Sequence, residues 1–312
     1  MRKIDTNRIY NCNNIDCLSD IKIFPDNTVD LIVTSPPYAE RRTDSYGGIA
    51  PNKYVDWFLP ISNQLKRILK KRGSFILNIK ENVNNCERQT YVLELMLALK
   101  KQGWYWVEEY CWYKKNAYPG KWPNRFRDTW ERCFHFTKNK HFKMYQDAVK
   151  VPIGDWAKPR FRSMTEKDFI RHVSRTKSKF GRNVSNWLNK TRVYPHNVVI
   201  FEKEHYVEPT NVLHFATECS NRKHSAVFPL ELPTWFIKLF TKKGDLVLDP
   251  FLGSGTTIFA SALLGREFLG VEIIKKYARQ AYNRVINLSK EVGVKIDCKL
   301  VNFSNKKSRR NV

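Results

Sequence analysis

One short segment near the amino terminus combines the groups needed to hold a nucleic-acid base by its amino group. It reads Thr34-Ser35-Pro36-Pro37-Tyr38 and follows a short apolar run. Such an amino group is a poor nucleophile because its lone pair is delocalised into the ring, so an enzyme that alkylates it must supply acceptors and clamp the ring. The prolines fix their φ angles and lack an N–H, so the turn can present carbonyl acceptors. Ser35 adds a hydroxyl, and Tyr38 offers a face on which an extruded base can stack. The segment alone also fits a plain strand-to-loop turn with a buried tyrosine.

A second segment, near the other end of the chain, has the composition of a nucleoside-cofactor site. An apolar strand runs into an acid and a glycine loop, a helix follows, and the next strand ends in a second acid. Glycines let the backbone approach a ligand closely, and an acid roughly 20 residues further on accepts hydrogen bonds from ribose hydroxyls. The third glycine of a dinucleotide site is missing, and Asp249 suits a cationic ligand, which favours S-adenosylmethionine over NAD. The residues that we expect to bind this cofactor are Asp249, Pro250, Phe251, Gly253, Gly255, Thr256 and Glu272.

The composition indicates a globular protein with a polyanionic partner. Lys and Arg number 55 against 30 Asp and Glu, a formal net charge of +25. Nucleic acid is the first candidate partner, and an anionic membrane surface is the second. No apolar run approaches the length of a membrane-spanning helix, and the amino terminus lacks a signal-peptide core. The seven cysteines are scattered without a CxxC pair, so we expect neither disulfides nor a metal site, and a reducing cytoplasm.

Outside the middle of the chain, the hydrophobic pattern is that of an α/β protein. Apolar runs predict strands over 29–33, 74–79, 104–113, 246–248 and 268–271, and helical periods predict helices over 54–71, 89–101 and 256–264. Alternating strands and helices of these lengths predict a mostly parallel sheet with helices on both faces.

The middle of the chain is basic and rich in aromatic residues. Between Lys114 and Lys203, Lys and Arg outnumber Asp and Glu about three to one. Residues 157–192 have many charges, few aliphatic side chains and no strand period, so they read as a small insertion. We expect residues 151–205 to recognise a DNA target, with phosphate contacts giving affinity and a few side chains reading base edges. The side chains that we expect to contact DNA are Arg125, Arg127, Arg160, Arg162, Lys177, Lys179 and Arg182.

With both motifs placed, the chain resembles the amino-methyltransferases of bacterial restriction–modification systems, over roughly residues 5–150 and 205–290. The order of the motifs, catalytic first and cofactor second, is similar to that of the circularly permuted group called beta. The resemblance implies a Rossmann-like S-adenosylmethionine-dependent methyltransferase fold. It also implies that Asp16, in a segment where Ile15 replaces the usual glycine, contacts the cofactor adenine. The segment from Trp112 to Glu131 resembles the part of the family that flanks the target-base pocket, although Arg127 and Glu131 would equally suit a surface pair.

The resemblance also implies a substrate. Ser-Pro-Pro-Tyr is usual for cytosine-N4 methylation, whereas Asp or Asn in the first position is usual for adenine-N6 methylation. Ser35 and the Pro36 carbonyl would accept hydrogen bonds from the amino group of a flipped cytosine, Pro37 would shape the turn, and Tyr38 would stack on the ring. Carbon-5 methylation would need a Pro-Cys pair, which the chain lacks. The alternatives are an adenine-N6 enzyme of the same fold and a non-catalytic DNA-binding module.

The expected organisation has four parts. They are a catalytic half (1–150), a target-recognition region (151–205), a cofactor-binding half (206–295) and a basic tail (296–312). The expected partners are double-stranded DNA and a separately encoded restriction endonuclease, with no membrane. The chain would act as a monomer or homodimer in the cytoplasm, associated with the nucleoid.

Overall fold

The computed structural model describes residues 4–41, 43–114, 129–152, 228–291 and 295–302, together with 162, 192–193, 213–215 and 293. The predicted target-recognition region therefore lies almost entirely outside the described residues, as does the end of the basic tail.

A nine-stranded sheet organises the described residues, in the order β10-β6-β7-β3-β2-β11-β12-β1-β13. Only β7 runs against its neighbours, β3 and β6, and the other pairings are parallel. The mostly parallel sheet predicted from the alternating pattern is thus confirmed. The strands are β1 (Arg8–Asn11), β2 (Val29–Thr34), β3 (Leu69–Ile79), β6 (Tyr105–Lys114), β7 (Trp130–Thr137), β10 (Leu213–Phe215), β11 (Leu246–Asp249), β12 (Glu267–Glu272) and β13 (Lys299–Asn302). A short hairpin joins β4 (Val83–Asn84) to β5 (Glu87–Arg88), and β8 (Val151–Pro152) pairs antiparallel with β9 (Arg192–Val193).

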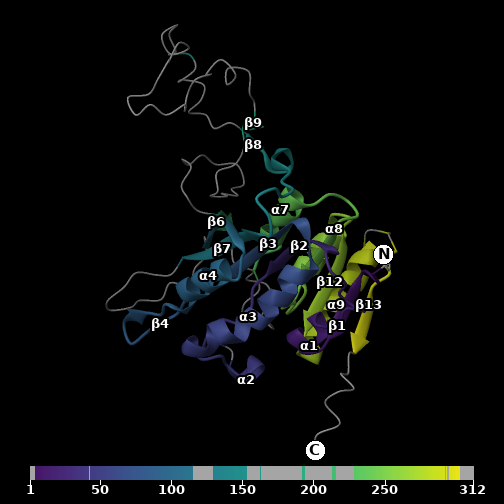
Figure 1. The fold of residues 1–312 in the computed structure, drawn as a ribbon. Helices are drawn as coiled ribbons and strands as arrows, with labels where there is room; N and C mark the ends of the chain where they lie inside the picture. Colours follow the sequence, from purple (N-terminus) through teal and green to yellow (C-terminus); the bar gives the residue numbers. More distant parts are fainter. Residues whose placement is uncertain are drawn as a thin grey trace, which may run out of the picture.

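Helices cover both faces of this sheet (Figure 1). One face packs against α1 (Asn14–Leu18), α3 (Pro51–Ile68) and α4 (Tyr91–Lys101), and the other against α7 (Glu231–Phe240), α8 (Thr256–Leu263) and α9 (Lys275–Glu291). The strands alternate accordingly, since Ile32 packs in the first core and its neighbours Leu31 and Val33 pack in the second. A short helix α2 (Thr43–Tyr46) and a 3-10 turn η1 (Gln146–Val149) complete the elements. Within the described ranges, no helix has both the length and the apolar character to cross a membrane.

The two sequence motifs meet because their strands are neighbours. Strand β2 pairs in parallel with β11, with Leu31 opposite Val247 and Ile32 opposite Leu248. Parallel strands end at the same edge of a sheet, so the turn after β2 and the glycine loop after β11 lie side by side. Ligands of open α/β sheets bind in the crevice outside these carboxyl ends.

Strand β3 begins earlier than the periodicity predicts. The helical period extends to residue 71, but α3 ends at Ile68 and β3 starts at Leu69. Leu69 is buried and pairs with Val29 at the start of β2. The side chain of the next residue, Lys70, reaches Asp30 with its Nζ 2.5 Å from Oδ2. Because of these tertiary contacts, residues 69–71 belong to β3, although the local periodicity alone predicts that the helix continues through them.

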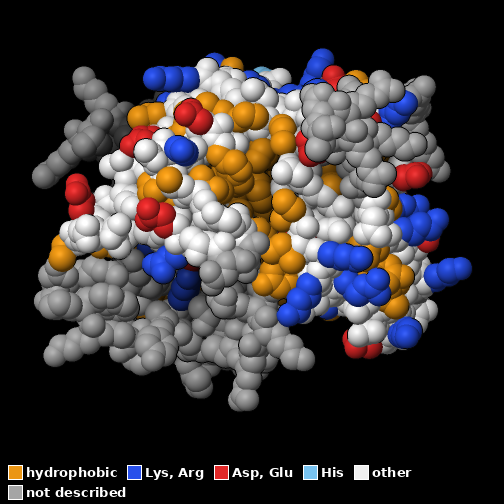
Figure 2. Space-filling model, turned by 90° about the horizontal axis from the view of Figure 1, so that it is seen from below, with side chains coloured by type: hydrophobic (Ala, Val, Ile, Leu, Met, Phe, Trp, Pro, Cys, Tyr) orange, Lys and Arg blue, Asp and Glu red, His pale blue; other side chains and the backbone are white. Residues whose placement is uncertain are grey.

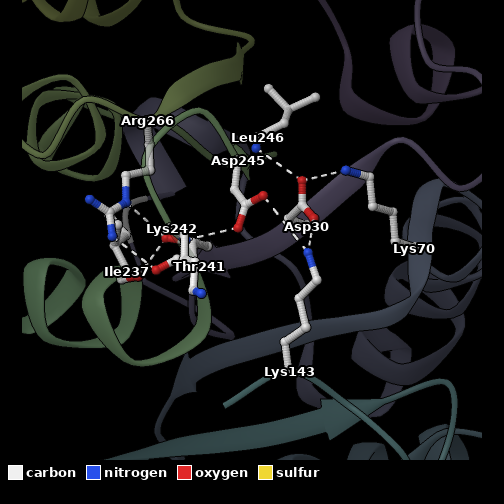
Figure 3. Close-up of polar contacts among 9 residues, drawn as sticks. All are labelled: Asp30, Lys70, Lys143, Ile237, Thr241, Lys242, Asp245, Leu246 and Arg266. Atoms are coloured by element: carbon white, nitrogen blue, oxygen red, sulfur yellow. Dashed lines mark hydrogen bonds and ion pairs between the residues drawn. The ribbon is translucent and has the colours of Figure 1, made fainter. Parts of the chain in front are cut away.

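Asp30 is the centre of a buried polar cluster at the edge of the sheet opposite the two motifs (Figure 3). Its side chain is 2% exposed and accepts from Lys70 Nζ at 2.5 Å, Lys143 Nζ at 3.2 Å and the backbone N–H of Leu246 at 3.1 Å. Asp245 lies 3.8 Å from the same Lys143. One carboxylate therefore ties β2 to β3, to the start of β11 and to the segment after β7.

Candidate active site

A cavity of about 1180 Å³ lies at the carboxyl ends of the parallel strands and is lined by both motifs. Figure 2 shows the molecule from below relative to Figure 1, which is the side where the arrowhead of β13 lies. Hydrophobic side chains form a band across this face. The predicted site residues that line the cavity are Ser35, Pro36, Pro37, Tyr38, Asp249, Phe251, Gly253, Thr256 and Glu272. The fold thus brings residues from the two ends of the chain into one site.

The Ser-Pro-Pro-Tyr turn is held from two sides. The hydroxyl of Tyr54, on α3, donates to the Pro37 carbonyl at 2.8 Å. The Tyr38 hydroxyl donates to Glu131 Oε2 at 2.6 Å, and the Ser35 hydroxyl lies 3.5 Å from the Tyr38 oxygen. Burial, reinforced by the nearby Glu131 charge, raises the pKa of Tyr38 well above its usual value. Tyr38 is therefore a neutral phenol that keeps its proton for donation.

Glu131 is a buried acid inside this site. It lies on β7, is 7% exposed, and its second carboxylate oxygen contacts the Lys114 ammonium on β6. The alternative of a surface pair for Glu131 is wrong, because the residue is buried and its carboxylate contacts Tyr38. Arg127 lies outside the described residues. The sequence placed Glu131 in the segment that resembles the surroundings of the target-base pocket, but no local pattern connects it with Tyr38.

Asp249 joins the two motifs directly. Its carboxylate is 2% exposed and accepts from Thr34 Oγ1 at 2.6 Å, Thr257 Oγ1 at 2.7 Å and the Phe251 N–H at 3.1 Å. Burial raises the pKa of Asp249 to about 6, although these three hydrogen bonds act in the opposite direction. The carboxylate therefore holds the ends of β2 and β11 together while it faces the cavity.

This pKa predicts that cofactor binding depends on pH. Below about pH 6 Asp249 is neutral and above it is ionised, whereas an α-ammonium group stays positive up to about pH 7.7. Because a carboxylate attracts the cationic end of the expected cofactor, S-adenosylmethionine, its affinity should rise about tenfold between about pH 5 and pH 7. Calorimetric titration across this range measures the effect.

Burial also raises the pKa of Glu272, so its titration could contribute to the same pH dependence. The variant Asp249→Asn separates the contribution of Asp249 from that of Glu272. The variant should bind more weakly at pH 7 and show a flatter pH profile, provided that its melting temperature shows a folded chain. A flat profile in the unmodified protein would contradict the role of Asp249.

Glu272 braces the glycine loop from the next strand. Its carboxylate, 2% exposed at the end of β12, accepts the Gly253 N–H at 2.7 Å and the Ile274 N–H at 2.8 Å, and the Tyr46 hydroxyl lies 3.4 Å away. A carboxylate oxygen has more than one lone pair, so acceptor capacity is left for ligand hydroxyls. Ile273, 48% exposed, adds an apolar surface beside it at the cavity.

Three predicted cofactor residues stand apart from the cavity lining. Gly255 directly precedes α8 with a φ of +86°, and a Cβ there would lie 2.6 Å from that of Ala281, so the turn and the packing of α8 on α9 require glycine at this position. The Pro250 carbonyl accepts from the Asn14 amide. Asp16 is exposed on α1, whereas the preceding residues 13–15 line the cavity.

The sequence motifs missed several residues that complete the cavity. They include Asn13, Asn14, Ile15, Arg41, Tyr46, Trp57, Asn78, Lys114, Phe228 and Ile273. Arg41 and Ile273 lie within three residues of a motif, and residues 13–15 and Lys114 belong to segments that resemble the family; the others come from elements that no short spacing connects with either motif.

The predicted DNA contacts fall mostly outside the described residues. Arg162 is described and exposed, and the other six lie in undescribed ranges. Among the described residues, no group of three or more His, Cys, Asp or Glu side chains is arranged to hold a metal ion.

Comparisons with known proteins agree with this geometry. The N6/N4 methyltransferase family model, described as DNA methylase, matches residues 29–283. The Type II methyltransferase M.PvuII of Proteus hauseri is 27% identical over 301 residues, covering 88% of this chain and 84% of the relative. The Type II methyltransferase M.BglII of Bacillus subtilis is 27% identical over 281 residues, covering 88% and 68%.

Solved structures share the fold. The PvuII DNA methyltransferase, described as cytosine-N4-specific, superposes with a TM-score of 0.62 at 20% identity, covering 96% of both chains. A Thermus thermophilus protein solved in complex with S-adenosyl-L-methionine superposes with a TM-score of 0.58 at 20% identity, covering 96% of this chain and 99% of the other. The Rossmann-like methyltransferase fold expected from the motifs is confirmed.

Proposed function

This chain belongs to the N6/N4 family of S-adenosylmethionine-dependent DNA methylases, and on that premise we propose that it methylates the N4 amino group of a cytosine flipped out of duplex DNA. The observation that carries the choice of base is Ser35 as the first residue of the catalytic turn, at the wall of the cavity that both motifs line. The relative and the solved structure named for PvuII, the latter described as cytosine-N4-specific, support the same choice.

The cofactor fits one end of this cavity. Glu272 has acceptor capacity for ribose hydroxyls, and its bond to the Gly253 N–H holds the loop backbone at the cavity wall. Ile273 and Trp57 provide apolar surface for a flat ring. Asp249, whose other partners are all neutral donors, supplies negative charge for a cationic group. When bound, the cofactor supplies a sulfonium methyl group that passes to the amino nitrogen, which then releases a proton to water.

The base fits the other end. Ser35 and the Pro36 carbonyl would accept the amino hydrogens and so direct the nitrogen lone pair toward the methyl group. Tyr54 holds the Pro37 carbonyl, which keeps the turn in one conformation. The Tyr38 ring, partly buried against the core, would stack on the base. Most of the acceleration would come from holding the two reactants in line.

Digestion of methylated DNA to nucleosides tests the choice of base. Plasmid DNA is incubated with the protein and labelled S-adenosylmethionine, digested to nucleosides and analysed by mass spectrometry. We expect N4-methylcytosine. If the only product were N6-methyladenine, the inference from Ser35 would be wrong, and if no label were transferred, the chain would be a binding module.

The remaining parts of the proposal concern the rest of the chain. The motif order supports a beta-type circular permutation, because the catalytic strand β2 precedes the cofactor strand β11 in sequence although they pair in space. We infer that residues 1–150 and 206–295 form the two halves of the core, and that 151–205 recognise the target. The protein would act in the cytoplasm, as a monomer or homodimer, and protect DNA from a separately encoded endonuclease.

A further inference from the structure

A chain of hydrogen bonds runs from the catalytic serine into the protein, and its direction is set at its buried end. The chain passes from Ser35 to Tyr38 and from Tyr38 to Glu131. We propose that Glu131 is a positioning residue that makes Ser35 a hydrogen-bond acceptor toward the amino group of the target base. This inference rests on the proposed amino-methyltransferase function and holds for either base.

The direction follows from what each group can donate. An ionised carboxylate only accepts, so the contact at 2.6 Å must use the proton of Tyr38. The phenol keeps that proton, since burial raises the pKa of Tyr38 well above its usual value. The Tyr38 oxygen can then only accept from Ser35, which lies 3.5 Å away. With its proton directed inward, the Ser35 oxygen presents lone pairs to the cavity.

Competing arrangements for the Tyr38 proton are weaker. Asn78 Oδ1 is an alternative acceptor, but it lies 3.4 Å from the Tyr38 oxygen. A short bond to a charged acceptor is stronger than a long bond to a neutral amide. Asn78 also donates its amide to the Arg132 carbonyl at 3.1 Å, which fixes its orientation. Glu131 therefore determines where the proton points.

Lys114 makes the carboxylate specifically necessary. Tyr38 and Lys114 both donate, and they contact the two different oxygens of Glu131. A glutamine has one oxygen and one NH2 group, so in Glu131→Gln one of these two donors must face another donor. If Tyr38 faces the NH2 group, its proton must turn to Asn78 Oδ1 or to Ser35, so the short bond to Glu131 no longer sets the direction of the Tyr38–Ser35 contact. Where the proton turns to Ser35, the serine offers its own proton to an amino group that also donates.

Single-turnover methyl transfer tests this role. Glu131→Gln should lower the rate of methyl transfer roughly 10- to 100-fold, the range that loss of a hydrogen bond to a charged group supports. Binding of S-adenosylmethionine and of DNA should stay within about threefold of the wild type, because the two carboxylate oxygens of Glu131, although the residue lines the cavity, contact the protein groups Tyr38 and Lys114. The matched control is Glu109→Gln on β6. Glu109 also faces a cation, with its carboxylate 3.3 Å from Arg132, but it does not line the cavity, so its rate should not change.

A double-mutant cycle separates positioning from mere stability. Tyr38→Phe removes the middle of the chain but keeps the ring, and Glu131→Gln should cost little more in that background. If the two substitutions instead damaged the structure independently, the fold-losses in methyl-transfer rate of the single variants would multiply in the double variant. Melting temperatures of all variants show that the measured chains are folded.

The outcomes are distinct. A Glu131→Gln variant with the wild-type rate, or losses that multiply in the double variant, would overturn this inference while the wild-type product still supports the proposed function. A wild type that labels no base would overturn the proposed function and this inference with it.

Discussion

Replacing Glu272 by alanine should weaken binding of S-adenosylmethionine by roughly 100- to 1000-fold. The carboxylate holds the Gly253 and Ile274 backbone N–H groups and is the acceptor that we propose for the ribose hydroxyls. Each hydrogen bond to a charged group contributes about 1.5–3 kcal/mol, and two ligand contacts at the lower end of this range, about 3–4 kcal/mol together, account for the expected loss. The alanine also leaves the Gly253 N–H without its partner, which loosens the loop at the cavity wall. Isothermal titration with the cofactor measures the change.

Two further variants sharpen this experiment. Glu267 begins the same strand but is exposed at the opposite end, so Glu267→Ala should leave the affinity within about twofold. Glu272→Gln keeps one acceptor and should fall between the wild type and the alanine variant. Wild-type affinity in a folded Glu272→Ala chain would mean that the acid is only a brace for the loop.

Replacing Asp30 by alanine should lower the free energy of unfolding by about 3 kcal/mol. The change removes two charge-assisted hydrogen bonds, to Lys70 and Lys143, and leaves the N–H of Leu246 buried without an acceptor. The cost stays moderate because both lysines are partly exposed, 41% and 33%, and can return to water. Urea unfolding measures the difference.

The control is a surface acid with a similar cation contact. Asp26 lies 2.6 Å from Arg67 but its side chain is 54% exposed, so Asp26→Ala should cost less than about 1 kcal/mol. Equal costs for the two variants would mean that burial does not strengthen the Asp30 cluster. Cofactor affinity in folded Asp30→Ala should be unchanged, because the cluster lies at the opposite edge of the sheet from the cavity.

The acidic residues at the two ends of the parallel strands have different kinds of partner. At the end where the strands start, Asp30 joins β2 to β3 and β11 and contacts two lysines, and it does not line the cavity of the two motifs. At the other edge, Asp249 and Glu272 are held mainly by neutral donors, which keeps their charge available to a ligand. Acidic residues therefore stabilise the fold at one end of the sheet and, in the function that we propose, bind the cofactor at the other.

The positions of most elements follow from local pattern. Alternation and helical periods place the strands before Ser35 and Asp249 and the helices between them, because hydrophobic periodicity reflects which face each element buries. The end of α3 was wrong by a turn because the contacts of Leu69 and Lys70 with β2 are tertiary. Gly255 was predicted for the ligand from spacing alone, whereas Ala281 of a later helix shows why only glycine fits there.

The sequence by itself determined the two motifs, their order and the chemistry that they suit: acceptors and an aromatic ring for a base, and a glycine loop with acids for a charged nucleoside. These are properties of residue type and short spacing, which the chain carries before it folds. Only the tertiary structure decided that Glu131 lies behind Tyr38 and that Asp249 bonds to Thr34. Those contacts depend on which strands are neighbours, and sheet order joins residues 93 and 215 positions apart that no local pattern relates.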